Sequence, residues 1–162
     1  MTAEMRHHIL SVLVENKPGV LARVSGLFAR RGFNIFSLAV APTDDPTRSR
    51  ITIVVDVDSA PLEQIVKQLD KLINVLQIDE LAPVDAVERE LMIVTVTVPG
   101  SSRAELLALT EEYSGVVLDE AGDRMTVSLG GTPEALDAFT ARMGAAVVGY
   151  QRTGRIALPR ID

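Results

Sequence analysis

The apolar residues of this chain follow one order twice: strand, helix, strand, strand, helix, strand. In the first half, the apolar run 8–15 is typical of a buried central strand, and the residues after it repeat with helical spacing. Two further strands, a second helix and a last strand follow before residue 82. This order predicts an antiparallel sheet with both helices on one face, the ferredoxin-like βαββαβ arrangement. The expected fold class is α+β, with two such domains in tandem.

The first helix is predicted from the turn residues Pro18 and Gly19 and from the spacing of the apolar residues after them. Its apolar face should consist of Val20, Leu21, Val24, Leu27 and Phe28. Gly32 follows two arginines and can adopt the left-handed conformation that commonly ends a helix. The helix is therefore expected between Gly19 and Gly32.

Two further strands, a second helix and a last strand complete the first half. The apolar run 34–40 predicts the second strand, and the alternation over 51–57 predicts a third strand with one buried face. Pro61 suits the first position of the second helix, because that position needs no backbone N–H. Residues 75–81 form the expected last strand, so that 1–82 makes one domain.

The second half is predicted to repeat this fold with a different sequence. Residues 83–89 form the expected linker and residues 90–162 the second domain. Its first helix should begin at a capping box over 102–105, and its second helix at the N-cap Thr132. Its final strand is expected within 147–158.

Charge and composition restrict the kind of partner. The chain has 16 basic and 22 acidic residues and a formal net charge of −6, and an acidic surface repels the nucleic-acid backbone. Aromatic residues make up 4% with no Trp, which leaves few platforms for stacking bases. Cysteine is absent, which excludes thiolate chemistry and fits a reducing cytoplasm. Because no apolar run is long enough to span a bilayer, we expect a cytoplasmic protein with neither a nucleic-acid nor a membrane partner.

Residue types that could act as catalysts are poorly placed. The histidines, His7 and His8, are neighbours in a predicted strand, where their side chains point to opposite faces and cannot share a metal. The carboxylate pairs at 44–45 and 111–112 fall in a loop and on an exposed helix face, without the burial that acid-base catalysis requires. The glycine pair at 130–131 precedes a predicted helix, but it lacks the lysine of a phosphate-binding loop. The sequence therefore predicts no catalytic residue and no metal site.

The turn Asn16-Lys17-Pro18-Gly19 between the first strand and the first helix has chemistry suited to a ligand. A helix N-terminus presents free backbone N–H groups and a partial positive charge, so it can hold a carboxylate. Gly19 allows close approach of the backbone, Pro18 stiffens the turn, and the Asn16 amide can both donate and accept hydrogen bonds. These features suit an amino-acid ligand, although on spacing alone a plain tight turn is the simpler interpretation.

Longer stretches resemble the small regulatory subunit of acetohydroxyacid synthase, also called acetolactate synthase, and the first half resembles its ACT domain. The matching stretches are 16–24, 31–38, 41–46 and 62–72, and, with weaker likeness in the second half, 88–91 and 152–154. The resemblance implies an N-terminal ACT domain that senses an amino acid and dimerises, followed by an ACT-like domain with the ferredoxin fold.

The resemblance implies a regulatory chain and not an enzyme. In that family a large catalytic subunit carries thiamine diphosphate, magnesium and FAD and starts the synthesis of branched-chain amino acids. The small subunit holds none of these cofactors, activates the catalytic subunit and confers feedback inhibition, with valine as the expected effector and leucine or isoleucine as the alternatives. Its ACT domains pair side by side as a homodimer. Carried over by position, the valine site comprises Asn16, Pro18, Gly19, Val20 and Leu21 of one protomer with Asn34 and Ile35 of the other.

The sequence leaves two other classes of function open. A free-standing ACT protein could sense an amino acid and regulate another enzyme or a transcription factor. A small enzyme with the ferredoxin-like fold, of the mutase or acylphosphatase kind, is the other alternative, and the lack of a convergent acid-base set weighs against it. Copurification with a large FAD-containing partner would favour the regulatory subunit over the free-standing sensor, and a turnover assay of the isolated chain on acyl phosphates would test the enzyme alternative.

Overall fold

The computed structural model describes residues 7–56 and 59–161, which fold into two compact units. Unit 1 comprises Met1–Val87 together with Arg155–Asp162, and unit 2 comprises Glu88–Gly154. The predicted third strand can be followed as far as Asp56, since Val57 lies outside the described residues. Among the helices that the structure describes, none is long and apolar enough to cross a membrane.

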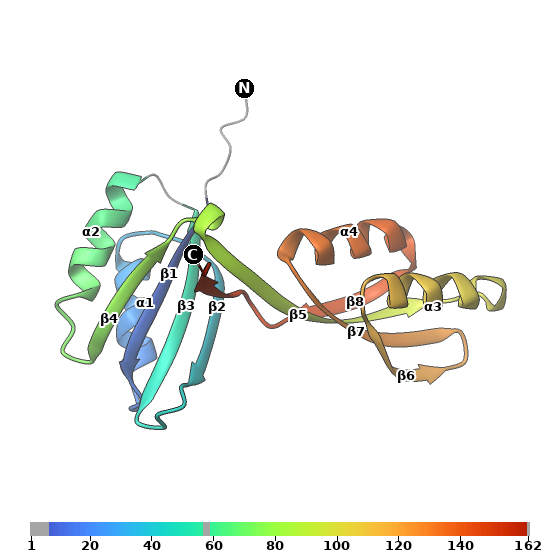
Figure 1. The fold of residues 1–162 in the computed structure, drawn as a ribbon, viewed down its shortest axis with the longest axis horizontal. Coiled ribbons are helices and arrows are strands. Elements are labelled where there is room, and N and C mark those ends of the chain that lie inside the picture. Colours follow the sequence, from blue (N-terminus) through green and yellow to red (C-terminus); the bar gives the residue numbers. More distant parts are fainter. Residues whose placement is uncertain (1–6, 57–58, 162) are drawn as a thin grey trace. The chain divides into compact units, whose positions relative to one another are not determined.

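Unit 1 has the predicted order of elements. They are β1 (His7–Glu15), α1 (Val20–Arg30), β2 (Ile35–Pro42), β3 (Arg48–Asp56), α2 (Ser59–Leu69) and β4 (Val75–Leu81). The strands form an antiparallel sheet in the order β2-β3-β1-β4, and both helices cover one face of it (Figure 1). The predicted ferredoxin-like fold is confirmed, and β1 is a central strand because it pairs with both β3 and β4.

Helix α1 begins and ends at the predicted glycines. Gly19 precedes it with φ 84° and Gly32 follows it with φ 71°, both in the left-handed region that glycine adopts without strain. Val20, Val24 and Phe28 are buried against the sheet, but Leu21, predicted on the same face, is 41% exposed. Helical side chains tilt toward the N-terminus, so this first-turn residue projects past the packed layer.

Strand β3 is buried on both faces, and the prediction of a single buried face is wrong. Thr52 and Val54, on the face away from the helices, are only 3% and 0% exposed. Val54 belongs to a second buried cluster with Ile9, Leu81, Ala86 and Ala157. The residues that cover this face therefore come from the end of the first half and from the C-terminal segment, which local periodicity does not reveal.

Unit 2 repeats the arrangement. Its elements are β5 (Ala86–Thr97, which begins in unit 1), α3 (Arg103–Glu112), β6 (Val116–Ala121), β7 (Arg124–Gly131), α4 (Pro133–Met143) and β8 (Val147–Arg152). The strand order is β6-β7-β5-β8, with antiparallel pairs throughout this path. The core lies between sheet and helices, where residues such as Met92, Val94 and Phe139 are fully buried.

The boundaries predicted for the second domain differ from those of the compact units. The expected linker 83–89 contains a short 3-10 helix, η1 (Pro83–Asp85), and β5 already begins at Ala86. The single strand expected within 147–158 is two strands, β8 and β9 (Ile156–Pro159). Gly154 adopts φ 91° between them, which interrupts the strand, and Ala157 is buried in unit 1. The predicted domain 90–162 therefore extends beyond the compact unit, which ends at Gly154.

The two predicted helix caps of unit 2 have different outcomes. Thr132 accepts a hydrogen bond from the Ala135 N–H at 3.2 Å, so the predicted N-cap of α4 is confirmed. Ser102 makes no such bond, because the 3-10 turn η2 (Gly100–Ser102) leads into α3 and leaves Ser102 with φ −104° and ψ 1°. An N-cap side chain usually needs extended backbone geometry, so the predicted capping box does not form.

Candidate functional site

The residues 16–19, here called the Gly19 turn, join β1 to α1 and leave the N-terminus of α1 open. Gly19 has φ 84° and ψ −10°, and no heavy atom lies within 4 Å of the position that a Cβ would occupy. Its carbonyl accepts the Arg23 N–H at 3.1 Å, as the N-cap carbonyl of a helix does. The turn therefore offers accessible backbone at the positive end of the helix dipole.

Asn16 holds the Gly19 turn against the loop between β2 and β3. Its side-chain Nδ2 donates to the Pro46 carbonyl at 2.9 Å, and its backbone N–H donates to the Thr47 carbonyl at 2.8 Å. The sequence indicated that the Asn16 amide could both donate to and accept from a ligand. In this structure one N–H of the side-chain amide is engaged by the protein, so its second N–H and its oxygen are available to a ligand.

A hydrogen-bonded network beside the turn was not predicted from the sequence. Asn74 Nδ2 donates to Glu15 Oε2 at 2.6 Å, and Lys17 Nζ lies 3.1 Å from the same oxygen. Arg23 Nη1 donates to Asn74 Oδ1 at 2.7 Å. The hydrogen bond from Asn74, followed by that from Lys17, lowers the pKa of Glu15 below its ordinary value. Because β4 pairs with β1, a ferredoxin-like topology already places the residue before β4 beside the end of β1.

The side chains of Val20 and Leu21, which follow the turn, differ in their exposure. Val20 is 4% exposed and packs in the core of unit 1, and its backbone N–H donates to the Lys17 carbonyl at 3.4 Å. The Leu21 side chain is 41% exposed. Pro18 is exposed in the turn itself. An apolar ligand group at this position would therefore contact Leu21 and Pro18 more than Val20.

Asn34 and Ile35 lie at the opposite end of unit 1 from the Gly19 turn. Ile35 pairs with Val55, whereas Glu15, which leads into the turn, pairs with Arg48 at the other end of β3. The 11 residues of α1 separate the two places by about 16 Å, at 1.5 Å of rise per residue. A single chain therefore does not bring all seven predicted site residues together.

Asn34 and Ile35 instead border a shallow hollow beside the C-terminal part of α1. The hollow has a volume of about 390 Å³, and helix residues such as Ser25 and Ala29 line its other side. Phe33 contributes apolar surface to it. Sequence reasoning did not predict this hollow, because its two walls come from separate elements.

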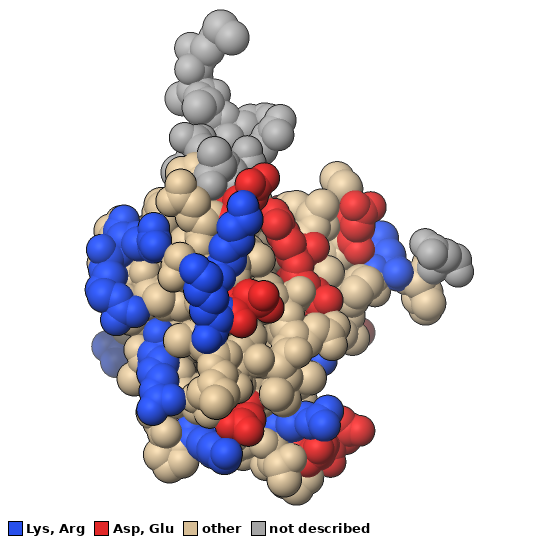
Figure 2. Space-filling model, turned by 90° about the vertical axis from the view of Figure 1, so that its left-hand side faces the viewer, with Lys and Arg blue, Asp and Glu red and all other residues tan. Residues whose placement is uncertain are grey.

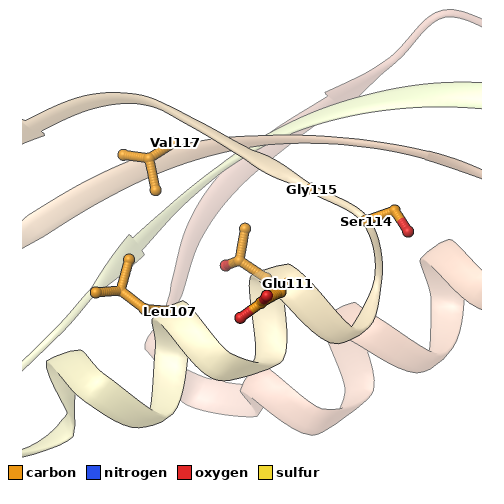
Figure 3. A pocket seen from close by; sticks show the side chains of 6 residues that line it. Leu107, Glu111, Ser114, Gly115 and Val117 are labelled. Carbon is orange, nitrogen blue, oxygen red and sulfur yellow. The ribbon is translucent and has the colours of Figure 1, made fainter.

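A second hollow, of about 550 Å³, lies in unit 2 between α3 and β6 (Figure 3). None of the predicted site residues borders it. Its floor includes Gly115, where an added Cβ would lie 2.4 Å from Leu129 Cδ2 and 2.9 Å from Thr110 Cγ2. Only glycine fits at this position, because a Cβ would overlap the buried side chains of Leu129 and Thr110. The sequence signal for this site is the Ser114-Gly115 turn after α3.

The two histidines make separate contacts with neighbouring strands. His7 Nδ1 lies 2.5 Å from Asp56 Oδ1 on β3, and His8 Nδ1 lies 3.5 Å from Glu80 Oε1 on β4. Within residues 7–56 and 59–161, no group of three His, Asp or Glu side chains could hold a metal ion. Each histidine thus contacts a single carboxylate on a neighbouring strand.

Basic and acidic residues are unequally distributed. Figure 2 shows Lys and Arg side chains gathered along one side of the molecule. The exposed basic residues of α1, α2 and the turns after them are Arg23, Arg30, Arg31, Lys67 and Lys71. Residues 88–154, by contrast, include five basic and ten acidic residues. Unit 2 is therefore the more acidic part of the chain.

Two family models match nearly the whole chain in succession. The model of the AHAS small subunit-like ACT domain matches residues 10–77, which include the Gly19 turn. The model of the small subunit of acetolactate synthase matches residues 89–161.

Individual relatives agree with these matches. The chain is 49% identical over 156 residues to the acetolactate synthase isozyme 3 small subunit of Salmonella typhimurium, covering 95% of this chain and 96% of that one. It is 50% identical over 132 residues to the acetolactate synthase small subunit of Mycolicibacterium smegmatis, covering 82% and 78%. The crystal structure of the acetolactate synthase small subunit from Thermotoga maritima superimposes with a TM-score of 0.89 at 35% identity, over 97% of this chain and 99% of that one.

Proposed function

Because the chain belongs to the family of acetolactate synthase small subunits, we propose that it regulates a separate catalytic subunit of that enzyme in the cytoplasm. It raises the activity of the catalytic subunit and makes that activity sensitive to valine. The thiamine diphosphate, magnesium and FAD belong to the catalytic subunit. The observation that carries the proposal is the identity of about half of all residues over almost the full length of a named small subunit.

We propose that two copies of the chain pair through β2. This strand lies at an edge of the unit 1 sheet, and four of its residues, Phe36, Val40, Ala41 and Pro42, are exposed. A free edge offers a row of backbone groups to a second strand, and the commonest dimers are two-fold symmetric. A two-fold axis makes the β2 strands antiparallel, so that the start of one strand lies beside the end of the other.

Such pairing would complete the amino-acid site. Ile35 begins β2 and Pro42 ends it, and Pro42 pairs with Ser49 at the same end of the sheet as the Gly19 turn. In the dimer, Asn34 and Ile35 of one copy therefore approach the Gly19 turn of the other. This arrangement accounts for predicted site residues that lie about 16 Å apart within one chain.

The chemistry of the completed site suits valine. The carboxylate would accept hydrogen bonds from the backbone N–H groups at the start of α1, where the helix dipole favours negative charge. The ammonium group would donate to the amide oxygens of Asn16 and Asn34. The isopropyl group would contact Leu21 and Ile35, which are both partly exposed. Leucine or isoleucine would fill the same space with one further methylene.

Binding of valine does not by itself inhibit the catalytic subunit. The ligand must prefer the inactive arrangement of the complex, and allosteric couplings of this kind are about 1–3 kcal/mol. Because the proposed site is divided between two copies, valine stabilises one particular pairing of the ACT domains. That pairing is the element through which the ligand acts on the catalytic subunit.

The test is to add the purified chain to a catalytic subunit and follow acetolactate formation while titrating valine, leucine and isoleucine. The expected result is a higher rate on addition of the chain and inhibition when valine is added. A rate that does not change on addition of the chain would contradict the proposal and would favour a free-standing amino-acid sensor.

A further inference from the structure

Strand β6 is an apolar edge strand that pairs on one side with β7 and has no strand on its other side among the described residues. It is the first strand in the order β6-β7-β5-β8, and all six of its residues are exposed. Val116, Val117 and Leu118 follow one another with exposed fractions of 60%, 37% and 53%. Natural proteins avoid a free edge with consecutive aliphatic residues, because it pairs readily with another strand. These residues are therefore suited to being covered by a partner.

The hollow between α3 and β6 lies directly beside this edge. Val117 and Leu107 point into it from opposite walls (Figure 3), and Thr110 and Gly115 also line it. Val117 pairs with the buried Val127, which shows that it lies on the helix side of the sheet. A strand added along β6 would direct alternate side chains to this same side. One of these side chains would enter the hollow.

The charges around the hollow restrict what can bind there. Glu111 lines the hollow and forms no ion pair with a basic side chain among the described residues. Glu120 differs, because Arg103 Nε and Nη2 hold its carboxylate at 2.6 and 2.8 Å. The uncompensated charge beside the apolar strip is therefore negative, and a basic side chain on the occupant would complement it.

A second copy of the chain is a poor occupant of this edge. Pairing β6 with β6 would bring Glu111 and Asp119 of both copies to one interface, and residues 88–154 already include ten acidic against five basic residues. Like charges facing each other disfavour such pairing. The charge thus favours a different protein.

We propose that β6 and the adjoining hollow are a docking surface for an extended, basic segment of the catalytic subunit. The segment adds to the sheet as a further strand, inserts an aliphatic side chain between Leu107 and Val117, and places a Lys or Arg beside Glu111. This inference rests on the proposed function, because it takes the catalytic subunit as the partner.

The test measures binding of the full chain to the catalytic subunit by calorimetry, with two matched pairs of variants. Glu111→Lys reverses the charge in the hollow, and Glu105→Lys is its control on the exposed surface of the same helix. Val117→Thr makes the hollow polar at nearly constant volume, and Val148→Thr is its control on β8, the opposite edge of the sheet. Hydrogen exchange of the amides in β6 is followed with and without the catalytic subunit.

We expect Glu111→Lys and Val117→Thr each to weaken binding about tenfold, within the range for interface positions that matter, while both controls stay within about twofold of wild type. Amides of β6 should exchange more slowly in the complex. Wild-type affinity in both variants, with unprotected β6 amides, would overturn the docking site while leaving the proposed function intact. A wild-type chain that does not bind the catalytic subunit would overturn both. Self-association that is lost in Val117→Thr would show that a second copy covers this edge and would overturn the proposal.

Discussion

Arg152 pairs with a carboxylate that is almost fully buried: its Nη2 lies 2.5 Å from Oε2 of Glu90, whose side chain is only 5% exposed. Glu90 lies on β5 and Arg152 on β8, two adjacent strands of unit 2. The same guanidinium also pairs with Asp137 on α4, whose side chain is 64% exposed. One arginine thus joins two strands to a helix.

The Arg152→Ala variant should destabilise unit 2 by about 3 kcal/mol or more, because it leaves a buried carboxylate without a partner. Asp137→Ala is the matched control and should cost about 1 kcal/mol or less, since its pair with Arg152 is exposed on one side. Urea unfolding followed by circular dichroism, with hydrogen exchange of the β5 amides to identify unit 2, measures both. Equal losses of unfolding free energy in the two variants would show that the burial of Glu90 does not determine the cost of removing Arg152.

Gly115→Ala should also destabilise unit 2, by about 1–3 kcal/mol, because the added methyl group overlaps Leu129 and Thr110. Gly130→Ala is the control, since no atom lies within 4 Å of the corresponding Cβ position and its φ is not in the left-handed region. The difference between their thermal unfolding midpoints tests this. A Gly115→Ala protein as stable as Gly130→Ala would contradict the packing at the floor of the hollow.

Gly19→Asp should reduce valine affinity at least about tenfold, because it places a negative charge where the ligand carboxylate belongs. The left-handed φ of 84° makes any side chain there somewhat strained, so Gly19→Asn is the control: it has nearly the same shape, tolerates this conformation and carries no charge. Calorimetry with valine compares them. Near-normal affinity in Gly19→Asp would exclude the Gly19 turn as the carboxylate site.

Asn34→Ala should weaken valine binding, and mixing it with Gly19→Asp should restore some sites. In a mixed dimer, one site receives both substitutions and the other receives neither. Random pairing therefore restores about a quarter of the sites, if the pocket is shared across a two-fold axis. The number of valine molecules bound per chain, measured after the two proteins are co-refolded, decides this. No recovery of sites would place the pocket within one protomer.

Asn74→Ala should change how stability depends on pH. The hydrogen bonds from Asn74 and Lys17 lower the pKa of Glu15 from its ordinary value of 4.5, so their stabilising effect is present above that pH. The effect is lost as the pH falls through the lowered pKa of the folded state. The variant should therefore lose less stability than wild type between about pH 6 and pH 3.

Urea unfolding midpoints across that range measure the effect of Asn74→Ala. Arg23→Ala is the control, because it removes the other hydrogen bond of Asn74 and leaves Glu15 in place. Parallel pH profiles for wild type and Asn74→Ala would show that the network does not stabilise the ionised Glu15.

Features that depend only on residues close together in the sequence could be predicted from it. The spacing of Val20, Val24 and Phe28 predicts a helix with a buried face, and Gly19 and Gly32 mark its ends, because helical period and left-handed glycine are properties of a few consecutive residues. Thr132 could be predicted as the N-cap of α4 for the same reason. The Gly19 turn, too, could be recognised as a possible carboxylate site from its composition alone.

Only the tertiary structure decided the features that depend on residues distant in the sequence. The second face of β3 is buried because Ala86 and Ala157 pack against Val54, and no local pattern in β3 reveals this. Asn74 reaches Glu15 because β4 pairs with β1. The separation of Ile35 from the Gly19 turn follows from the register of the sheet, and it means that one chain supplies only half of the proposed pocket. Spacing along the chain specifies local conformation, whereas the contacts between elements depend on how the whole sheet assembles.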